Sequence, residues 1–235
     1  MTWAEHARRA ERRFNDGRRR LPSDPAARQK QLVRIAMAAS SAGLAELMRR
    51  RPDEATPWLL RSAEAYRASW EHAPPGSWGR PIGALKAVVL AGDVTAAVET
   101  ATWAASLDSA QADSPIARYS AVLASLVLGS DVDAAPLADG LRGDDSFPAA
   151  TADALSALAH REPARYRGAL GEVLADFEAR ANFLEGLPVA DTVLVLEALA
   201  ERRGLAVRPV SRLLPTPDSA RGAAGFRPDQ ASRTR

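Results

Sequence analysis

Repeated signals for starting and stopping helices constrain this chain more than any other feature. Four predicted helix starts consist of a polar residue followed by proline, namely Asp24-Pro25, Thr56-Pro57, Ser114-Pro115 and Glu162-Pro163. Proline suits the first position of a helix, where its missing N–H is not needed, and short polar side chains accept hydrogen bonds from the free amides there. Apolar runs are followed by Gly92, Gly129 and Gly204, which is typical of left-handed helix stops. The chain is therefore predicted to be a series of helices with local boundaries.

Between these signals, apolar residues recur every three or four positions, as on one face of a helix. The pattern predicts about ten helices, including one that begins at Thr56-Pro57 and one that runs from Glu162-Pro163 to Leu184. Loops of a few residues force sequential helices to pack as antiparallel neighbours. The predicted fold class is therefore all-α, either a helical bundle or a tetratricopeptide-like array, with a short extended segment at 205–210.

A possible internal repeat leaves these two architectures open. The sequences LAGD at 90–93 and LGSD at 128–131 each end one predicted helix and begin the next, 38 positions apart. That spacing is close to the periods of helical repeats, but a regular solenoid usually needs at least ~3 copies. We find no third copy with the same aromatic and alanine positions.

The C-terminal part divides into a packed and an unpacked segment. Leu205, Val207 and Val210 alternate, which predicts that they lie against the bundle while Arg208 and Arg212 face water. From residue 216 onward the only large apolar residue is Phe226, which cannot compensate for the entropy of ordering. We therefore expect one helical domain over 1–215 and a disordered tail over 216–235.

Composition excludes several classes of protein. The 235 residues contain no cysteine, which rules out disulfides and thiolate metal sites. No apolar window approaches the ~18 residues of a membrane span, and the charged start is unlike a secretory signal, so a cytoplasmic location is expected. Nearly all basic residues are arginine, and with abundant alanine this suggests a GC-rich bacterial genome.

Two histidines are the candidate catalytic bases. His72 follows Glu71, and His160 stands at the end of another predicted helix, but a histidine in a last turn is explained by the helix dipole. The chain has neither a phosphate-binding glycine loop nor a nucleophile elbow. The sequence therefore predicts no enzyme, no cofactor and no metal site.

Charge is distributed unevenly along the chain. Residues 1–51 hold 13 Arg and Lys against 5 Asp and Glu, a net of +8, whereas residues 91–160 hold 10 acidic residues against two arginines, a net of −8. Acidic residues interrupt the arginine runs and no stacking aromatics accompany them, so nucleic-acid binding is not expected. We predict instead that Asp131, Asp133, Asp144 and Asp145 form a surface for a basic protein partner.

The aromatic residues are predicted to lie mostly in the core. Trp58, Tyr66, Trp70, Trp103 and Tyr119 stand at helical spacings, where large aromatics anchor packing. Trp78 stands in a Pro/Gly-rich loop and is predicted to be exposed, as a partner-binding anchor, because tryptophan is enriched among interface hot spots.

Two stretches resemble a known family. AEAYRASW at 63–70 and the C-terminal LPVADTVLVLEALAERRGLAVRPVSRLLP are similar to the immunity protein 49 family, the antidotes of bacterial polymorphic toxin systems. The resemblance covers about a third of the chain and involves packing residues. It implies a protein that neutralises a cognate toxin by direct contact. A general tetratricopeptide-like scaffold and an enzyme using His72 or His160 remain the alternatives.

Overall fold

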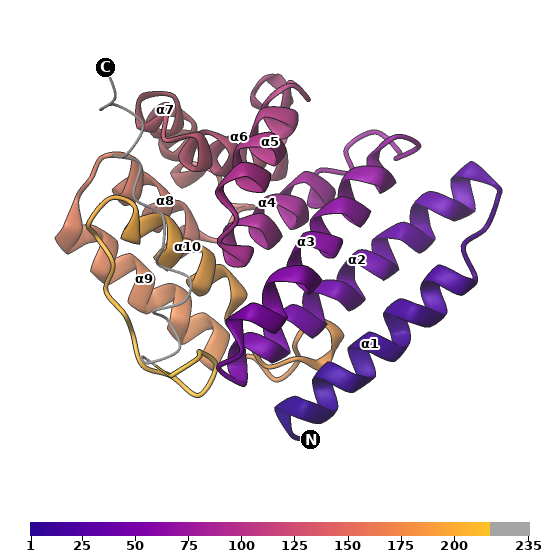
Figure 1. Ribbon diagram of the computed structural model, residues 1–235. Coiled ribbons are helices and arrows are strands. Elements are labelled where there is room, and N and C mark those ends of the chain that lie inside the picture. Colours follow the sequence, from indigo (N-terminus) through magenta and orange to yellow (C-terminus); the bar gives the residue numbers. More distant parts are fainter. Residues whose placement is uncertain (217–235) are drawn as a thin grey trace, which may run out of the picture.

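The computed structural model describes residues 1–216, in which ten α-helices follow one another without a β-strand (Figure 1). The helices are α1 (Trp3–Arg19), α2 (Pro25–Met48), α3 (Pro52–Trp70), α4 (Gly79–Ala91), α5 (Val94–Ala105), α6 (Pro115–Leu128), α7 (Asp131–Arg142), α8 (Ala149–Ala159), α9 (Pro163–Glu178) and α10 (Asp191–Glu201). Two short 3-10 helices, η1 (Ser109–Gln111) and η2 (Leu184–Gly186), lie in the connections. The all-α prediction is confirmed.

Each helix packs mainly on its neighbour in the chain. From α1 to α9, consecutive helices are the principal contacts, and α4 also contacts α6. The last helix, α10, returns to the middle and packs on α4, α8 and α9. In Figure 1, α1 to α3 form one side of the molecule and α8 to α10 the other, with α4 between them. The fold is thus an array of antiparallel helices closed by its last element.

Local capping chemistry explains most boundaries. Thr2 and Glu5 form a capping box at the start of α1, and Asp93 accepts a hydrogen bond from the amide of Ala96 at the start of α5. At the ends of α4 and α6, Gly92 and Gly129 have φ of +70° and +77°, which costs a glycine little. The boundaries predicted at Gly92, Asp93 and Gly129 are confirmed.

The predicted helix start at Thr56-Pro57 is wrong. Pro52 takes the first position of α3, and Pro57 lies inside the helix. The Thr56 hydroxyl donates to the carbonyl oxygen of Ala91 at 3.0 Å, so it satisfies the end of α4 rather than the start of α3. The helix predicted to reach Leu184 ends at Glu178 instead, and Leu184 is 72% exposed.

The C-terminal extended segment forms no strand, and its predicted alternation holds at Leu205 and Val207, which pack on the core, but not at Val210. Arg208 adopts a left-handed φ of +56°, which interrupts the alternation and leaves Val210 79% exposed. Leu213 and Leu214 supply the buried contacts instead. Within this segment, the amide of Val207 donates to both carboxylate oxygens of Glu197 on α10, at 3.1 and 3.0 Å. The segment is therefore held by Glu197, by the packing of Leu205 and Val207 on the core, and by the later apolar pair.

Small residues let the helices approach closely. A Cβ added to Gly43 of α2 would lie 2.6 Å from the Leu59 side chain, and one added to Gly83 of α4 would lie 2.5 Å from the Tyr66 ring. Buried alanines line most of the other contacts in the core. Helices packed through alanine and glycine lie close together, and buried leucines such as Leu59, Leu85 and Leu123 fill the space between them.

Two further predictions concern the C-terminal tail and membrane spans. Except for Thr216, the tail predicted to be disordered lies outside the described residues. Among the helices of residues 1–216, none combines the length and apolar character that crossing a membrane requires.

Candidate protein-binding groove

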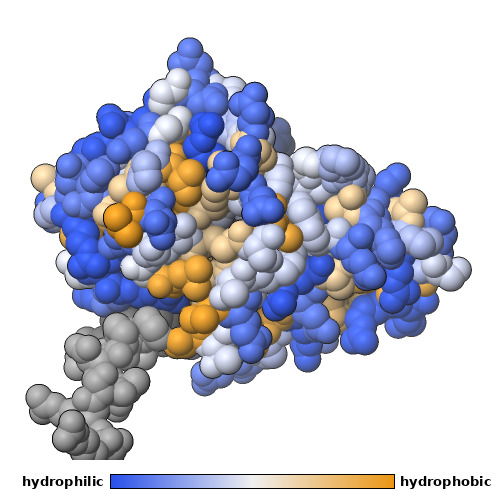
Figure 2. Space-filling model, turned by 90° about the horizontal axis from the view of Figure 1, so that it is seen from above, coloured by the Kyte–Doolittle hydropathy of each residue, from blue (hydrophilic) through white to orange (hydrophobic). Residues whose placement is uncertain are grey.

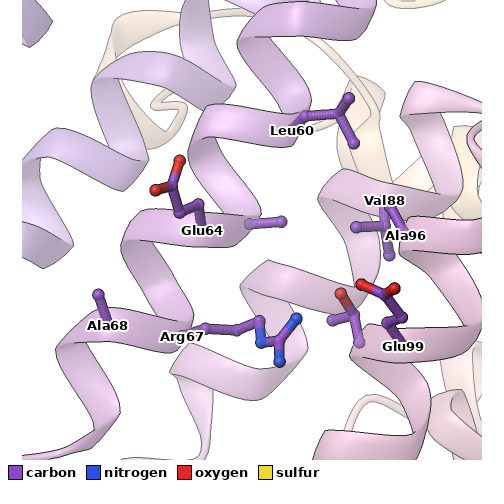
Figure 3. A pocket seen from close by; sticks show the side chains of 9 residues that line it. Leu60, Glu64, Arg67, Ala68, Val88, Ala96 and Glu99 are labelled. Carbon is purple, nitrogen blue, oxygen red and sulfur yellow. The ribbon is translucent and has the colours of Figure 1, made fainter.

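A groove runs between α3 and α5, with α4 as its floor. Its volume is about 400 Å³, and it is lined by Leu60, Ala63, Glu64, Arg67, Ala68, Val88, Ala96, Glu99 and Thr100. The α3 residues recur at intervals of three and four, and so do those on α5, so each helix presents one continuous stripe to the groove. In Figure 3 the α3 residues Leu60, Glu64, Arg67 and Ala68 lie on one side of the view, and Ala96 and Glu99 of α5 lie on the other, with Val88 beside Ala96.

The walls of the groove carry carboxylates. Glu64 on α3 and Glu99 on α5 are both exposed, and within residues 1–216 neither makes an ion pair. The third charged side chain, Arg67, reaches across the opening (Figure 3), and its guanidinium lies 5.4 Å from the centre of the Trp103 ring. A cation at that distance from an indole face is attracted by the ring quadrupole. The two carboxylates are thus available for a positively charged ligand.

A cluster of three tryptophans continues the groove, and we call it the tryptophan cluster. The ring centre of Trp70 lies 5.3 Å from that of Trp78 and 6.3 Å from that of Trp103, the latter pair at 88°. All three side chains are half-buried. Partly exposed tryptophans beside an arginine are the residue types that dominate binding energy at protein interfaces.

The aromatic predictions therefore need correction. Of the residues predicted for the core, only Tyr119 is buried, whereas Trp58, Tyr66, Trp70 and Trp103 are half-buried. Trp78 is not the isolated exposed anchor that we predicted, because its ring packs on Trp70. Each tryptophan of the cluster leaves part of its ring at the surface, beside a groove that helical spacing alone does not reveal.

The predicted acidic surface does not form the groove. Asp133 and Asp145 are exposed, and Asp144 is half-buried and accepts hydrogen bonds from the amide and hydroxyl of Ser146. Those two bonds hold the pKa of Asp144 below its ordinary value. Apart from Asp131, these residues remain available as surface charges, but they lie on α7 and the loop after it rather than on the groove.

Asp131 is an internal structural residue rather than a free loop charge. Its Oδ1 accepts from Nε of Arg203 at 2.9 Å, and the Arg203 side chain is only 3% exposed. Its Oδ2 accepts from Nε of Arg161 at 2.9 Å. The prediction of a partner-binding role missed this pair because Arg203 stands 72 positions away in the chain.

Neither histidine forms a catalytic arrangement. His72 is exposed beside Glu71, 4.0 Å from its carboxylate. Nε2 of His160 lies 2.9 Å from Oδ2 of Asp139, whose Oδ1 accepts from the hydroxyl of Ser156. Ser156 is fully buried and bonded to the aspartate rather than to the histidine, so the three residues lack the order of a nucleophilic triad.

A second polar cluster lies in the interior around Lys86 of α4. Its Nζ lies 2.5 Å from Oδ2 of Asp191 on α10, and Tyr66 and Tyr119 lie nearby. Burial lowers the pKa of Lys86, but the Asp191 carboxylate and the tyrosines more than offset this, so the pKa is raised overall. The ion pair between Lys86 and Asp191 therefore joins α10 to α4.

Metal ligation and relationships to known proteins add no further site. Within residues 1–216, no three His, Asp or Glu side chains are grouped so that they could hold a metal ion.

Comparison of the chain with protein-family models, curated proteins and solved structures finds no match in any of the three. The resemblance to the immunity protein 49 family therefore stays a prediction from the sequence.

Proposed function

We propose that this chain is an immunity-type binding protein that neutralises a cognate bacterial toxin by direct protein–protein contact. The observation that carries the proposal is the groove between α3 and α5, with its apolar floor and the tryptophan cluster at its end. Seen from above, apolar side chains form several separate groups among hydrophilic ones, most of them in the middle and lower part of the view (Figure 2). An apolar hollow with a polar rim is typical of a protein-binding surface.

The chemistry of the groove favours a macromolecular partner over a small substrate. Its volume of about 400 Å³ falls within the ~300–1,000 Å³ of small-molecule pockets, but such pockets place convergent polar groups around the ligand. Here the charged groups stand on the walls, and the floor offers only aliphatic surface. Such a surface suits side chains projecting from another protein.

The resemblance gives the proposal its biological class. The stretch AEAYRASW supplies both a groove wall, through Ala63, Glu64, Arg67 and Ala68, and one ring of the tryptophan cluster, Trp70. The other similar stretch forms α10 and the segment that closes the array. One part of the resemblance thus coincides with the candidate binding surface and the other with the element that stabilises it.

A general tetratricopeptide-like scaffold is the second candidate. The sequential antiparallel packing of the helices and the contact between α4 and α6 favour it. In a regular array of helix pairs, however, α3 and α5 would pack on each other as equivalent helices. They are separated by the groove instead, which makes this site different from a simple repeat interface.

Co-expression with a candidate toxin tests the proposal. The probe is the C-terminal module of a secreted multidomain protein encoded beside this gene. We expect that module alone to arrest bacterial growth, co-expression of this chain to restore growth, and the two purified proteins to co-elute in size-exclusion chromatography. An unrelated helical protein expressed at the same level is the control.

Three results would count against the proposal. These are a neighbouring gene set without such a module, growth arrest that this chain does not relieve, and relief without a complex. Binding to several unrelated proteins with similar affinity would favour the scaffold instead.

A further inference from the structure

We infer that the groove receives an amphipathic helix of the partner whose polar edges carry lysine or arginine; this inference rests on the proposed function. The occupant is thus defined by two properties, namely helical shape and positive charge. Each follows from a different observation.

Helical shape follows from the two facing stripes. On α3 the groove and the tryptophan cluster extend from Leu60 to Trp70, which is ten residues or about 15 Å of helix. Packed helices lie about 8–10 Å apart, with the ridges of one in the grooves of the other. A partner helix of about three turns lying between α3 and α5 would therefore contact both stripes and the floor of α4.

Two other modes of peptide recognition fit less well. Addition of a strand needs a sheet edge, and residues 1–216 contain no strand. Proline-rich peptides bind between parallel aromatic ridges, whereas Trp70 and Trp103 meet nearly at right angles and lie at one end of the groove. The aliphatic surface of Val88 on the floor and Leu60 on the α3 wall suits leucine-like side chains at helical spacing.

Positive charge follows from the unpaired carboxylates. Glu64 and Glu99 stand on opposite walls, so basic residues on both edges of a bound helix would meet one carboxylate each. Arg67 does not neutralise either of them by an ion pair, because its guanidinium lies over Trp103. An acidic helix would leave both carboxylates facing like charge and would be rejected.

A display experiment tests the occupant without requiring a known partner. The probe is a phage-displayed library of helix-forming peptides of about 15 residues, with all surface positions randomised. We expect selection on the wild-type protein to enrich peptides with apolar residues at i, i+4 and i+7 and with a net positive charge. The enriched peptides are then measured as synthetic peptides against purified variants.

The informative variant is Glu64→Arg/Glu99→Arg, and its matched control is Glu11→Arg/Glu172→Arg. All four glutamates are exposed helix residues, so both variants change charge equally, but only the first pair lies on the groove. We expect the groove variant to bind the enriched peptides at least tenfold more weakly at low salt, with a smaller loss at high salt, and the control variant to bind as wild type does. Thermal melting confirms that both variants fold.

Several outcomes would overturn the inference: no enrichment, enrichment of acidic or proline-rich peptides, or equal binding by both variants. The growth assay separates this inference from the proposed function. If the wild type relieves toxicity and Glu64→Arg/Glu99→Arg does so equally well, the groove assignment fails while the immunity function stands. If the wild type gives no relief but still selects basic helices in the groove, the toxin assignment fails instead.

Discussion

Breaking the ion pair between Asp131 and Arg203 should destabilise the protein more than any change to a surface charge. The Arg203 side chain is 3% exposed and the Asp131 side chain 16%. Besides the carboxylate, Arg203 donates to the carbonyl oxygens of Leu199 and Leu126, each at 2.9 Å. The guanidinium therefore joins the end of α10 to the end of α6 and the start of α7.

The expected loss of unfolding free energy depends on which hydrogen-bond partners remain after each substitution. Removing one partner of a buried pair costs roughly 3–5 kcal/mol, because the other charge stays buried without compensation. In Asp131→Ala the arginine keeps its two carbonyl acceptors, so we expect about 3 kcal/mol. In Arg203→Met the carboxylate keeps Arg161 and some exposure, so we expect about 1–2 kcal/mol. Replacing both partners should cost less than the sum, which gives a coupling of about 1–3 kcal/mol.

Urea denaturation followed by circular dichroism measures all three variants, and Arg161→Ala is the control. Arg161 contacts the same carboxylate but is 63% exposed, so its loss should cost less than about 1 kcal/mol. In a thermal scan, Asp131→Ala should melt about 6–12 °C lower than wild type. If Asp131→Ala costs no more than Arg161→Ala, or if the two single changes are additive, the pair is not the internal link described here.

Three further substitutions and one control substitution test the packing by the same denaturation assay. Leu199→Ala in the fully buried face of α10 should cost about 2–5 kcal/mol, and a loss under 1 kcal/mol would make that helix peripheral. Glu197→Ala should cost about 1–3 kcal/mol and speed amide exchange at 207 and 208; unchanged exchange there would refute its anchoring role. Gly83→Ala should cost about 1–3 kcal/mol because its Cβ would meet the Tyr66 ring, whereas Gly168→Ala, with nothing within 4 Å, should be neutral or stabilising by up to about 1 kcal/mol. Equal effects of the two alanines would contradict the close approach of α3 and α4.

Most helix boundaries could be predicted because the signals act locally. Thr2, Asp93 and Gly92 each bond or bend within four residues of their own position, so neighbouring residues determine their role. The failure at Thr56 is instructive, because a hydroxyl before proline looks like a cap. The Thr56 hydroxyl instead donates to the carbonyl oxygen of Ala91, 35 positions away.

The candidate site was less predictable because it depends on what the fold leaves uncovered. Spacing placed Trp70 and Trp103 on helix faces, and an apolar helix face is usually buried. Whether such a face is covered depends on where α5 lies relative to α3, which local sequence does not determine. The signal that could have been noticed is the pair Glu64 and Arg67 within the same face as Ala63, since charges in an apolar stripe suggest that part of it meets solvent.

In the proposed binding, the acidic segment affects mainly the rate of association and the groove mainly the rate of dissociation. The reason is that charge acts at a distance, whereas packing acts only on contact. Asp133, Asp144 and Asp145 belong to the segment with net charge −8, whose field would attract a basic partner before contact. Changing these three to lysine should therefore slow association and weaken its salt dependence while leaving dissociation nearly unchanged. Trp103→Ala should instead speed dissociation, because its ring contributes surface that is covered only in the complex. Association and dissociation rates for the cognate toxin module, measured at two salt concentrations, distinguish the two effects. If Trp103→Ala slowed association without changing dissociation, the assignment of dissociation to the groove would be wrong.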